Sequence, residues 1–305
     1  MKNYLYSFFI FLAGAIFSFS MPFLSGLAQD SLRVFQVPEN SADTLGIQKF
    51  ILPPFNKGDV LPIVSAKAIL VKDLSTDTAL FEYNANLSLP IASTTKIMTA
   101  LVASEYFKPN SVLVVGDGAN ISGARVGLTK GESLSFRALL YGLLLNSGND
   151  AAYTIAENYP GGVDGFVTAM NQKAKLLNLV SSHFDNPAGF DSPRHFSSAS
   201  DLAMISQESL KDGNLARIFA TKDTEVSSLD KKYNHRLVNL NKLLSQVTGV
   251  LGIKTGFTEA AKENLVTLVD RNGHKVLIIV LGSDDRFGES TKIIEWAYSN
   301  FVWQD

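Results

Sequence analysis

The 305-residue chain contains no cysteine. This absence excludes disulfide bonds, a thiol nucleophile and any metal site built on thiolates. Histidine is scarce, and its four side chains show no metal-ligand spacing, so we expect surface or structural roles for His183, His195, His235 and His274. A basic excess is also missing. The formal net charge of −2 gives no reason to expect nucleic acid as a partner.

Charged side chains are absent from the stretch between Lys2 and Asp30. A short basic start, an apolar middle and small residues near Ala28 are typical of a signal peptide. The stretch is also long enough to cross a bilayer as a helix. Residues 1–28 are therefore predicted to be either a cleaved signal peptide or an N-terminal membrane anchor. Either reading sends the rest of the chain out of the cytoplasm to the cell envelope.

Prolines and short polar turns interrupt every apolar run in residues 29–62, which predicts a linker. Residues 63–305 are expected to form one domain, since 46% of the whole chain is apolar and can bury a substantial core.

The hydrophobic pattern of this domain alternates between strand-like and helical segments. Strand-like runs at 68–71 and 79–83 flank a polar turn, and three more follow near 249–257, 264–269 and 275–281. Helical patterns occupy the middle and the end, near 135–145, 164–177, 200–211 and 289–301. The prediction is an α+β fold: an antiparallel sheet built from both chain ends, flanked by helices, with a mostly helical middle.

The first candidate for chemistry is the pair Ser93 and Lys96, at the start of an apolar helical pattern. Residues three apart share a helix face, so the amine can reach the hydroxyl. A serine needs such a base to become a good nucleophile. A second Ser-x-x-Lys sequence, Ser228 to Lys231, precedes a polar run instead of an apolar helix. Taken alone, the pair Ser93 and Lys96 also fits a helix cap with a solvated lysine.

Two further patterns are individually weak. Ser147-Gly148-Asn149 lies in a tight connection between two helices, where it also fits an ordinary turn. Lys254-Thr255-Gly256 ends an apolar strand, and its charge and hydroxyl suit a substrate carboxylate. The glycine lets a ligand backbone approach closely. The N–H of Phe257, together with that of Ser93, is a candidate oxyanion hole.

Together the three patterns follow the order and context of the triplet of penicillin-recognising serine acyl-transfer enzymes. The chain resembles the serine D-alanyl-D-alanine carboxypeptidases, the low-molecular-mass penicillin-binding proteins of the peptidase S11 family. The resemblance covers roughly residues 66–303 and includes the longer strings Ile91–Thr99, Ser147–Ala152 and Gly252–Thr258. It implies a fold like that of β-lactamases and penicillin-binding proteins.

The resemblance implies a two-step acyl transfer on peptidoglycan stem peptides. Ser93 would attack the carbonyl between two D-alanines while Lys96 takes its proton and Ser147 passes a proton to the leaving amine. Asn149 would hold the peptide amide, and Lys254 and Thr255 the terminal carboxylate. β-Lactam antibiotics would acylate the same serine as inhibitors, and no metal or organic cofactor is implied.

The sequence departs from the family pattern in places. Ala188 stands where similar members often carry histidine, and residues 259–263 are more charged than usual. The chain also stops after its closing helix, so we expect no β-rich second domain and no C-terminal anchor.

Three alternatives use the same motifs: an endopeptidase acting on cross-links, a β-lactamase, and a non-catalytic penicillin-binding sensor module. The absence of glutamate between Glu157 and Glu208 disfavours a class A β-lactamase, which needs a glutamate there to activate its deacylating water.

Overall fold

The computed structural model describes residues 52–304. The expected leader, 1–28, and the first part of the expected linker lie outside the described residues. In residues 52–304 no helix is both long enough and apolar enough to span a membrane.

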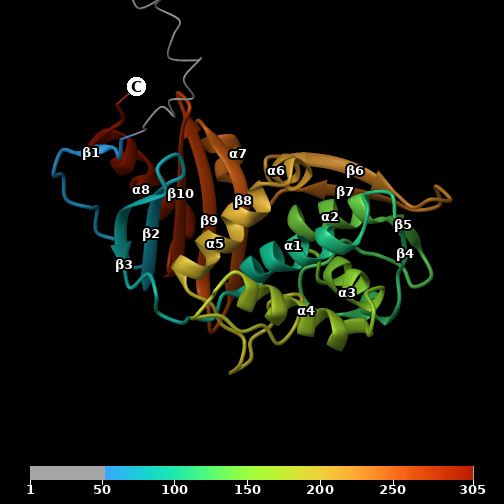
Figure 1. Cartoon of the computed structure of the whole chain (residues 1–305). Coiled ribbons are helices and arrows are strands. Elements are labelled where there is room, and N and C mark those ends of the chain that lie inside the picture. The colour runs from blue at the N-terminus through green and yellow to red at the C-terminus, as the bar shows by residue number, and fades with distance from the viewer. Residues whose placement is uncertain (1–51, 305) are drawn as a thin grey trace, which may run out of the picture. The chain divides into compact units, whose positions relative to one another are not determined.

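A five-stranded antiparallel sheet with the order β3-β2-β10-β9-β8 organises the domain (Figure 1). Its strands are β2 (Ala68–Asp73), β3 (Thr78–Tyr83), β8 (Val250–Thr258), β9 (Lys262–Arg271) and β10 (His274–Ser283). The N-terminal strand β2 pairs with the C-terminal strand β10, with Leu70 opposite Ile279. The prediction of an antiparallel sheet built from both chain ends is therefore confirmed.

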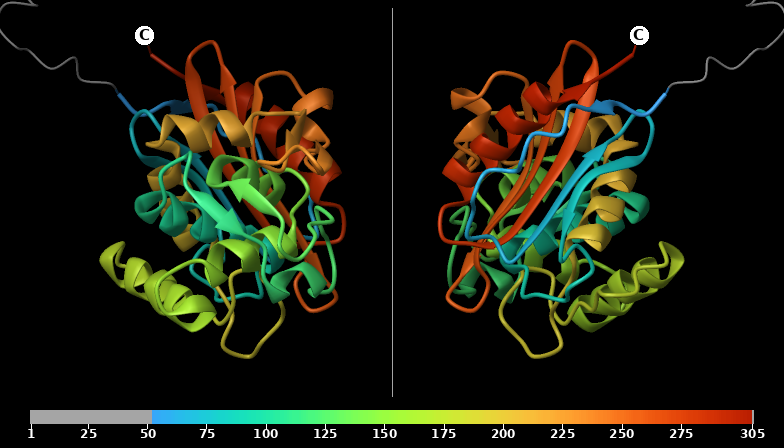
Figure 2. Two further views of the ribbon diagram at one scale, coloured as in Figure 1. Left: turned by 90° about the vertical axis from the view of Figure 1, so that its right-hand side faces the viewer. Right: turned by 90° about the vertical axis from the view of Figure 1, so that its left-hand side faces the viewer.

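Both faces of this sheet are covered, as β10 illustrates. Leu277 and Ile279 belong to one buried core, which they share with the helical middle of the chain, whereas Ile278 and Val280 belong to a second core beneath the last helix. Figure 2 shows this last helix, α8 (Arg286–Asn300), on the opposite side of the sheet from α5 (Ala199–Leu210). Burial on both faces explains why the strand reads as a continuous apolar run instead of an alternating one.

The four helical patterns predicted by range all form helices close to those ranges. The helices of residues 52–304 are α1 (Lys96–Tyr106), α2 (Phe136–Leu144), α3 (Asn149–Glu157), α4 (Gly162–Leu176), α5 (Ala199–Leu210), α6 (Gly213–Phe219), α7 (Leu243–Gln246) and α8 (Arg286–Asn300), with short 3₁₀ turns η1 (Ala92–Thr95) and η2 (Asp117–Asn120). Four of them begin at side-chain caps that the sequence supplies, at Ser135, Ser198, Asp212 and Asp285. Ser135 Oγ accepts from the N–H of Ala138, and Ser198 Oγ accepts from the N–H of Asp201.

Several small elements were not predicted. They are the pairs β4 (Val112–Val114) with β5 (Ser133–Ser135), β6 (Asp223–Ser227) with β7 (Asn234–Val238), and β1 (Phe55–Asn56) with β11 (Phe301–Val302), together with helix α7. Strands of two to five residues are too short to show a recognisable hydrophobic period. The second Ser-x-x-Lys sequence proves to be the turn between β6 and β7, where Ser228 Oγ donates to Asp230 Oδ1 at 2.6 Å.

The end of the expected linker contacts the C-terminal helix. The N–H of Lys57 donates to the carbonyl of Asn300 at 2.9 Å, and the indole N–H of Trp296 donates to the carbonyl of Asp59 at 3.1 Å. Residues 52–62 therefore belong to the surface of the folded domain.

Candidate active site

Ser93 lies in the 3₁₀ turn η1, directly before α1, as the position of the apolar pattern predicted. The turn is held by two neighbouring threonines. Thr94 Oγ1 donates to the carbonyl of Ile91 and Thr95 Oγ1 to the carbonyl of Ala92, both at 2.7 Å. Ala92 has a positive φ of 47°, an uncommon conformation for alanine. The backbone before the serine is therefore fixed by its neighbours.

Two glycines let other segments approach this turn. A Cβ on Gly256 of β8 would lie 3.2 Å from the nitrogen of Ser93, and a Cβ on Gly189 would lie 2.0 Å from the carbonyl oxygen of Ala92. The first contact brings the Lys254-Thr255-Gly256 strand beside the serine, as predicted. The second brings in the loop before α5, in which Ala188 was noted as a departure from the family pattern.

Lys96 is fully buried, and its amine nitrogen has three oxygen neighbours. Nζ lies 3.0 Å from Ser93 Oγ, 2.8 Å from Asn149 Oδ1 and 2.6 Å from the carbonyl oxygen of Ala188. The last two oxygens can only accept. A neutral amine has two N–H donors and one lone pair, so donation to these two oxygens directs the lone pair at the hydroxyl of Ser93.

The electrostatic surroundings favour that neutral amine. Burial lowers the pKa of Lys96 well below its usual value, and the nearby Lys254 lowers it further, while Asp150 acts in the opposite direction. A general base needs an unprotonated amine at the working pH. The arrangement can therefore accept a proton from Ser93.

Asp150 is a member of the site that the sequence reading did not single out. Its Oδ1 accepts from the N–H groups of Val126 and Ala151, both at 2.9 Å, and its Oδ2 from those of Gly127 and Leu128, at 2.8 and 3.1 Å. This buried carboxylate fixes the 126–128 loop to the start of α3. The sequence signal that could have identified Asp150 is its position directly after Asn149.

Asn149 lies beside Lys96, but its carboxamide is already engaged by the protein. Oδ1 accepts from Lys96, and Nδ2 donates to the carbonyl of Ser122 at 2.8 Å. Asn149 was expected to bind a substrate amide, and the structure adds a contact with Lys96 that was not expected. The second Nδ2 hydrogen remains available for a hydrogen bond to substrate.

Ser147 occupies the connection between α2 and α3 with a positive φ of 58°. Its side chain is buried, and among the described residues its Oγ has no hydrogen-bond partner. A buried hydroxyl without a partner costs free energy unless something binds it. Ser147 thus offers an unused hydroxyl two residues from Asn149.

Lys254 and Thr255 are buried on β8, and Lys254 Nζ donates to the carbonyl of Thr255 at 3.0 Å. Burial, assisted by the nearby Arg286, lowers the pKa of Lys254 to about 7. The next residues change exposure: Gly256 is buried, whereas Phe257 is 52% exposed. The strand therefore carries a buried amine up to the Ser93 turn and ends at the surface.

Arg286 is a further residue that sequence reasoning missed. One of its Nη1 hydrogens is donated to the carbonyl of Gly256 at 2.9 Å, and its backbone N–H donates to Glu263 Oε2 at 2.9 Å. Its half-buried guanidinium therefore supports the end of β8. Arg286 follows a hairpin far along the chain, and no short motif connects it with the other site residues.

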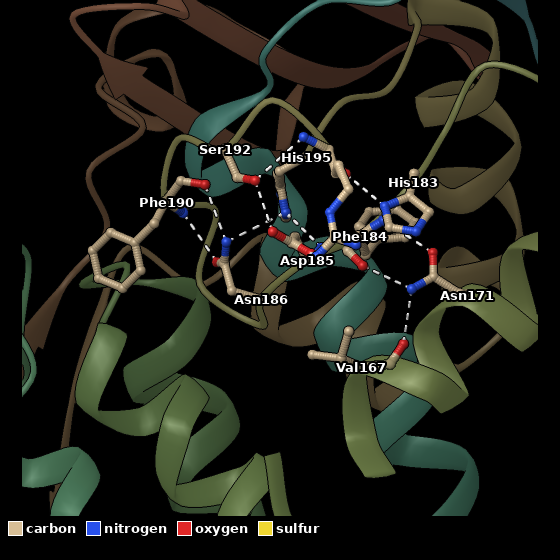
Figure 3. Close-up of polar contacts among 10 residues, drawn as sticks. Val167, Asn171, His183, Phe184, Asp185, Asn186, Phe190, Ser192 and His195 are labelled. Atoms are coloured by element: carbon tan, nitrogen blue, oxygen red, sulfur yellow. Dashed lines mark hydrogen bonds and ion pairs between the residues drawn. The ribbon is translucent and has the colours of Figure 1, made fainter. Parts of the chain in front are cut away.

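The loop before α5 is organised by Asn186 (Figure 3). Its Oδ1 accepts from the N–H groups of Ala188, Gly189 and Phe190 at 3.1, 2.7 and 3.0 Å, and its Nδ2 donates to the carbonyl of Phe190 at 3.0 Å. One carboxamide thus closes a tight turn around Ala188. The turn presents the carbonyl of Ala188, and not a side chain, to Lys96.

Metal ligation has no basis in the described part of the chain. Residues 52–304 contain no cluster of three or more histidine, aspartate or glutamate side chains able to hold a metal ion. The donors around Ser93 are amines, amides and main-chain carbonyls.

Comparisons with known proteins agree with this geometry. The family model for D-alanyl-D-alanine carboxypeptidases, peptidase S11, matches residues 56–285. The chain belongs to the peptidase S11 family. This confirms the resemblance inferred from the three motifs, and with it the predicted fold class.

Individual S11 relatives carry several activities in their names. The chain is 32% identical to the D-alanyl-D-alanine carboxypeptidase DacF of Bacillus subtilis over 77% of its own length and 63% of the relative's. It is 32% identical to a D-alanyl-D-alanine endopeptidase of Pseudomonas aeruginosa over 80% and 81%. The Streptomyces K15 DD-transpeptidase structure superposes with a TM-score of 0.75 at 29% identity, covering 79% of this chain and all of that one. The chain thus spans under two thirds of the Bacillus protein.

Proposed function

We propose that this S11 protein is a serine-type D-alanyl-D-alanine carboxypeptidase that trims the terminal D-alanine from peptidoglycan stem peptides. One observation carries the proposal. The buried amine of Lys96 lies 3.0 Å from Ser93 Oγ, and two acceptors, Asn149 Oδ1 and the Ala188 carbonyl, occupy its other hydrogens. A surface lysine beside a helix cap would have none of these features.

In the acylation step, Ser93 Oγ forms a bond to the carbonyl carbon of the penultimate D-alanine, and its proton passes to Lys96 Nζ. The backbone N–H groups of Ser93 and Phe257 are the proposed donors to the developing oxyanion. The C–N bond then breaks, and D-alanine leaves with a proton relayed from Lys96 through Ser147. Ser147 Oγ has no hydrogen-bond partner among residues 52–304 and is therefore available for this relay.

In the deacylation step, water attacks the ester carbonyl, Lys96 accepts its proton, and Ser93 recovers its hydrogen as the shortened peptide leaves. The same base thus serves both halves of the reaction. The proposed carboxylate site is made by Lys254 and Thr255, and Asn149 would donate its remaining Nδ2 hydrogen to the peptide amide.

Export to the cell envelope, where the substrate lies, belongs to the same proposal. It rests on the uncharged stretch between Lys2 and Asp30. Cleavage of this leader and its retention as a membrane tether are both compatible with the proposal. N-terminal sequencing of the protein from the envelope fraction distinguishes them.

A fluorescent penicillin tests the serine mechanism. The wild-type protein should form a stable covalent adduct, and Ser93→Ala should abolish it. Ser228→Ala, in the second Ser-x-x-Lys sequence, is the matched control and should label normally. Lys96→Ala should remain folded yet fail to label, because nucleophile and base act as a unit. Normal labelling of Ser93→Ala would refute the assignment.

The remaining activities differ in their products. Release of D-alanine from a pentapeptide identifies a carboxypeptidase, whereas cleavage of a cross-linked dimer identifies an endopeptidase, the activity in the name of the Pseudomonas relative. Rapid turnover of penicillin would identify a β-lactamase. Against that activity, no glutamate lies between Glu157 and Glu208, and Glu157 ends α3, where its Oε1 accepts from the N–H of Gly118 at 2.7 Å. Failure of several β-lactams to label the protein would favour a non-catalytic module.

A further inference from the structure

His195 lies in a buried network that the proposed mechanism does not use. Its side chain is 2% exposed, and Nδ1 accepts from the backbone N–H of Asp185 at 3.0 Å. Its other ring nitrogen, Nε2, lies 2.7 Å from Thr95 Oγ1. Figure 3 shows the ring among the residues that build the 185–190 loop. The imidazole therefore joins that loop to the turn that carries Ser93.

The donors and acceptors in this network fix the tautomer. Because Nδ1 accepts from Asp185, the neutral ring carries its hydrogen on Nε2 and donates it to Thr95 Oγ1. The threonine hydrogen is then free to be donated to the carbonyl of Ala92, at 2.7 Å. The result is one directed chain of hydrogen bonds from the loop, through His195 and Thr95, to the residue before the nucleophile.

The first turns of α1 contact the loop at two more points. Lys96 Nζ donates to the carbonyl of Ala188, and Thr99 Oγ1 donates to the carbonyl of Pro187 at 2.7 Å. Within the loop, Asn186 holds the N–H groups of residues 188 to 190. The loop is thus stiff internally. Its middle is docked onto α1 by these bonds, and the residue before it, Phe184, is held on α4 by Asn171.

We propose that His195 and Thr95 are positioning residues for the base. Their hydrogen bond docks the 185–190 loop so that the carbonyl of Ala188 stays on the Lys96 amine and the lone pair of that amine stays directed at Ser93. Without this bond, the carbonyl shifts and the amine turns among several orientations. This inference rests on the proposed acyl transfer and deepens it.

His195 stays in one charge state, as a purely positioning residue requires. Burial lowers its pKa to about 4, and the charged or titratable groups that act on it are Asp185, His183, Asp191 and Lys96. The ring is therefore neutral at the near-neutral pH where the base works, and the direction of the hydrogen-bond chain does not change there.

Neighbouring threonines provide a matched pair of variants. Thr94 and Thr95 are both fully buried, and each donates to the carbonyl three residues earlier at the same distance, but only Thr95 contacts His195. Thr94→Val and Thr95→Val therefore each remove one hydroxyl-to-carbonyl bond within the turn, but only Thr95→Val also removes the bond to His195. Thr95→Ser keeps the hydroxyl and hence both bonds.

The measurement separates binding from chemistry by following acylation with a fluorescent penicillin at increasing concentrations. Thr95→Val should lower the acylation rate constant about 10-fold to 100-fold, the usual cost of a small misplacement, with the noncovalent binding constant nearly unchanged. Thr95→Ser should stay within about threefold of wild type, and Thr94→Val should acylate at least about 10-fold faster than Thr95→Val. A residue that merely stabilises the fold would lower the melting temperature without changing the rate constant of the folded protein.

Substitutions of His195 test the same bond independently. The amide nitrogen of glutamine can occupy the place of Nε2, whereas the shorter asparagine reproduces only the Nδ1 end. His195→Gln should therefore acylate nearly as wild type, and His195→Asn should match Thr95→Val. If Thr95→Val does not fold, the two His195 variants test the positioning role instead.

The outcomes distinguish the two proposals. Equal acylation rate constants in Thr94→Val and Thr95→Val, or in the two His195 variants, would overturn the positioning role while leaving the serine mechanism intact. A wild-type protein that penicillin does not acylate would overturn the proposed function itself.

Discussion

Replacing Asp150 by asparagine tests how much the site depends on one buried carboxylate. Its two oxygens accept from four backbone N–H groups, two on each oxygen. An asparagine has one carbonyl oxygen, so either orientation of its amide leaves two N–H groups facing an NH₂ group. Each donor that loses its partner costs about 1 to 3 kcal/mol when buried. We therefore expect Asp150→Asn to lower the free energy of unfolding by about 2 to 6 kcal/mol.

The same substitution has an electrostatic effect on the base. Asp150 raises the pKa of Lys96 against the larger effects of burial and Lys254. Removing the carboxylate lowers that pKa further. Acylation requires the unprotonated amine, so the acid limb of the acylation rate should move to lower pH.

Urea unfolding and a pH series of penicillin acylation measure the two effects separately. Asp230→Asn is the matched control, because Asp230 accepts both of its hydrogen bonds on the single oxygen Oδ1, in an exposed turn. An asparagine there keeps both bonds, and we expect a cost under about 1 kcal/mol. Equal stability of the two variants, or an acid limb that moves to higher pH in Asp150→Asn, would refute the reasoning.

Further predictions concern Gly189, His195 and Lys254. Gly127 and Gly189 share a φ of +93°. A Cβ would meet nothing within 4 Å at Gly127, whereas at Gly189 it would lie 2.0 Å from the Ala92 carbonyl oxygen. Gly189→Ala should therefore unfold at a lower urea concentration than Gly127→Ala and acylate more slowly. The pKa of His195 falls from 6.5 to about 4 on folding, so its neutral form contributes stability above pH 6.5 that is lost toward pH 4. This amounts to about 3 kcal/mol and should be absent from urea titrations of His195→Gln. Lys254→Met removes the ammonium that lowers the pKa of Lys96, so the acid limb of acylation should move to higher pH, and an unmoved limb would contradict that coupling.

The sequence alone predicted the sheet because its strands have strong local signals, and the three motifs because they occur together in one order. Apolar runs such as the one in β10 are long enough to be recognised as buried strands, and Asn272-Gly273, between β9 and β10, is a strong hairpin signal. The Ser93 turn carries an unusual combination of a hydroxyl and an amine at the head of an apolar helix.

Other parts of the site could not be predicted because their chemistry lies in the backbone. Ala188 contributes only its carbonyl to Lys96, and any residue type has a carbonyl. Asp150 binds main-chain N–H groups of a loop more than 20 residues earlier. The positions of Gly189 and Gly256 reflect close approaches between segments far apart in the chain. Sequence patterns record side-chain chemistry, so such contacts leave no motif.

Lys96 and Lys254 are two buried lysines whose charges oppose each other. Burial lowers the pKa of both amines, and the charge of Lys254 lowers that of Lys96 further. A proton on Lys254 therefore opposes protonation of Lys96. The cation proposed to bind the substrate carboxylate thus also keeps the base unprotonated. Binding a carboxylate would partly neutralise that cation and raise the pKa of Lys96, which prepares the amine to take the proton of Ser93 once substrate is in place.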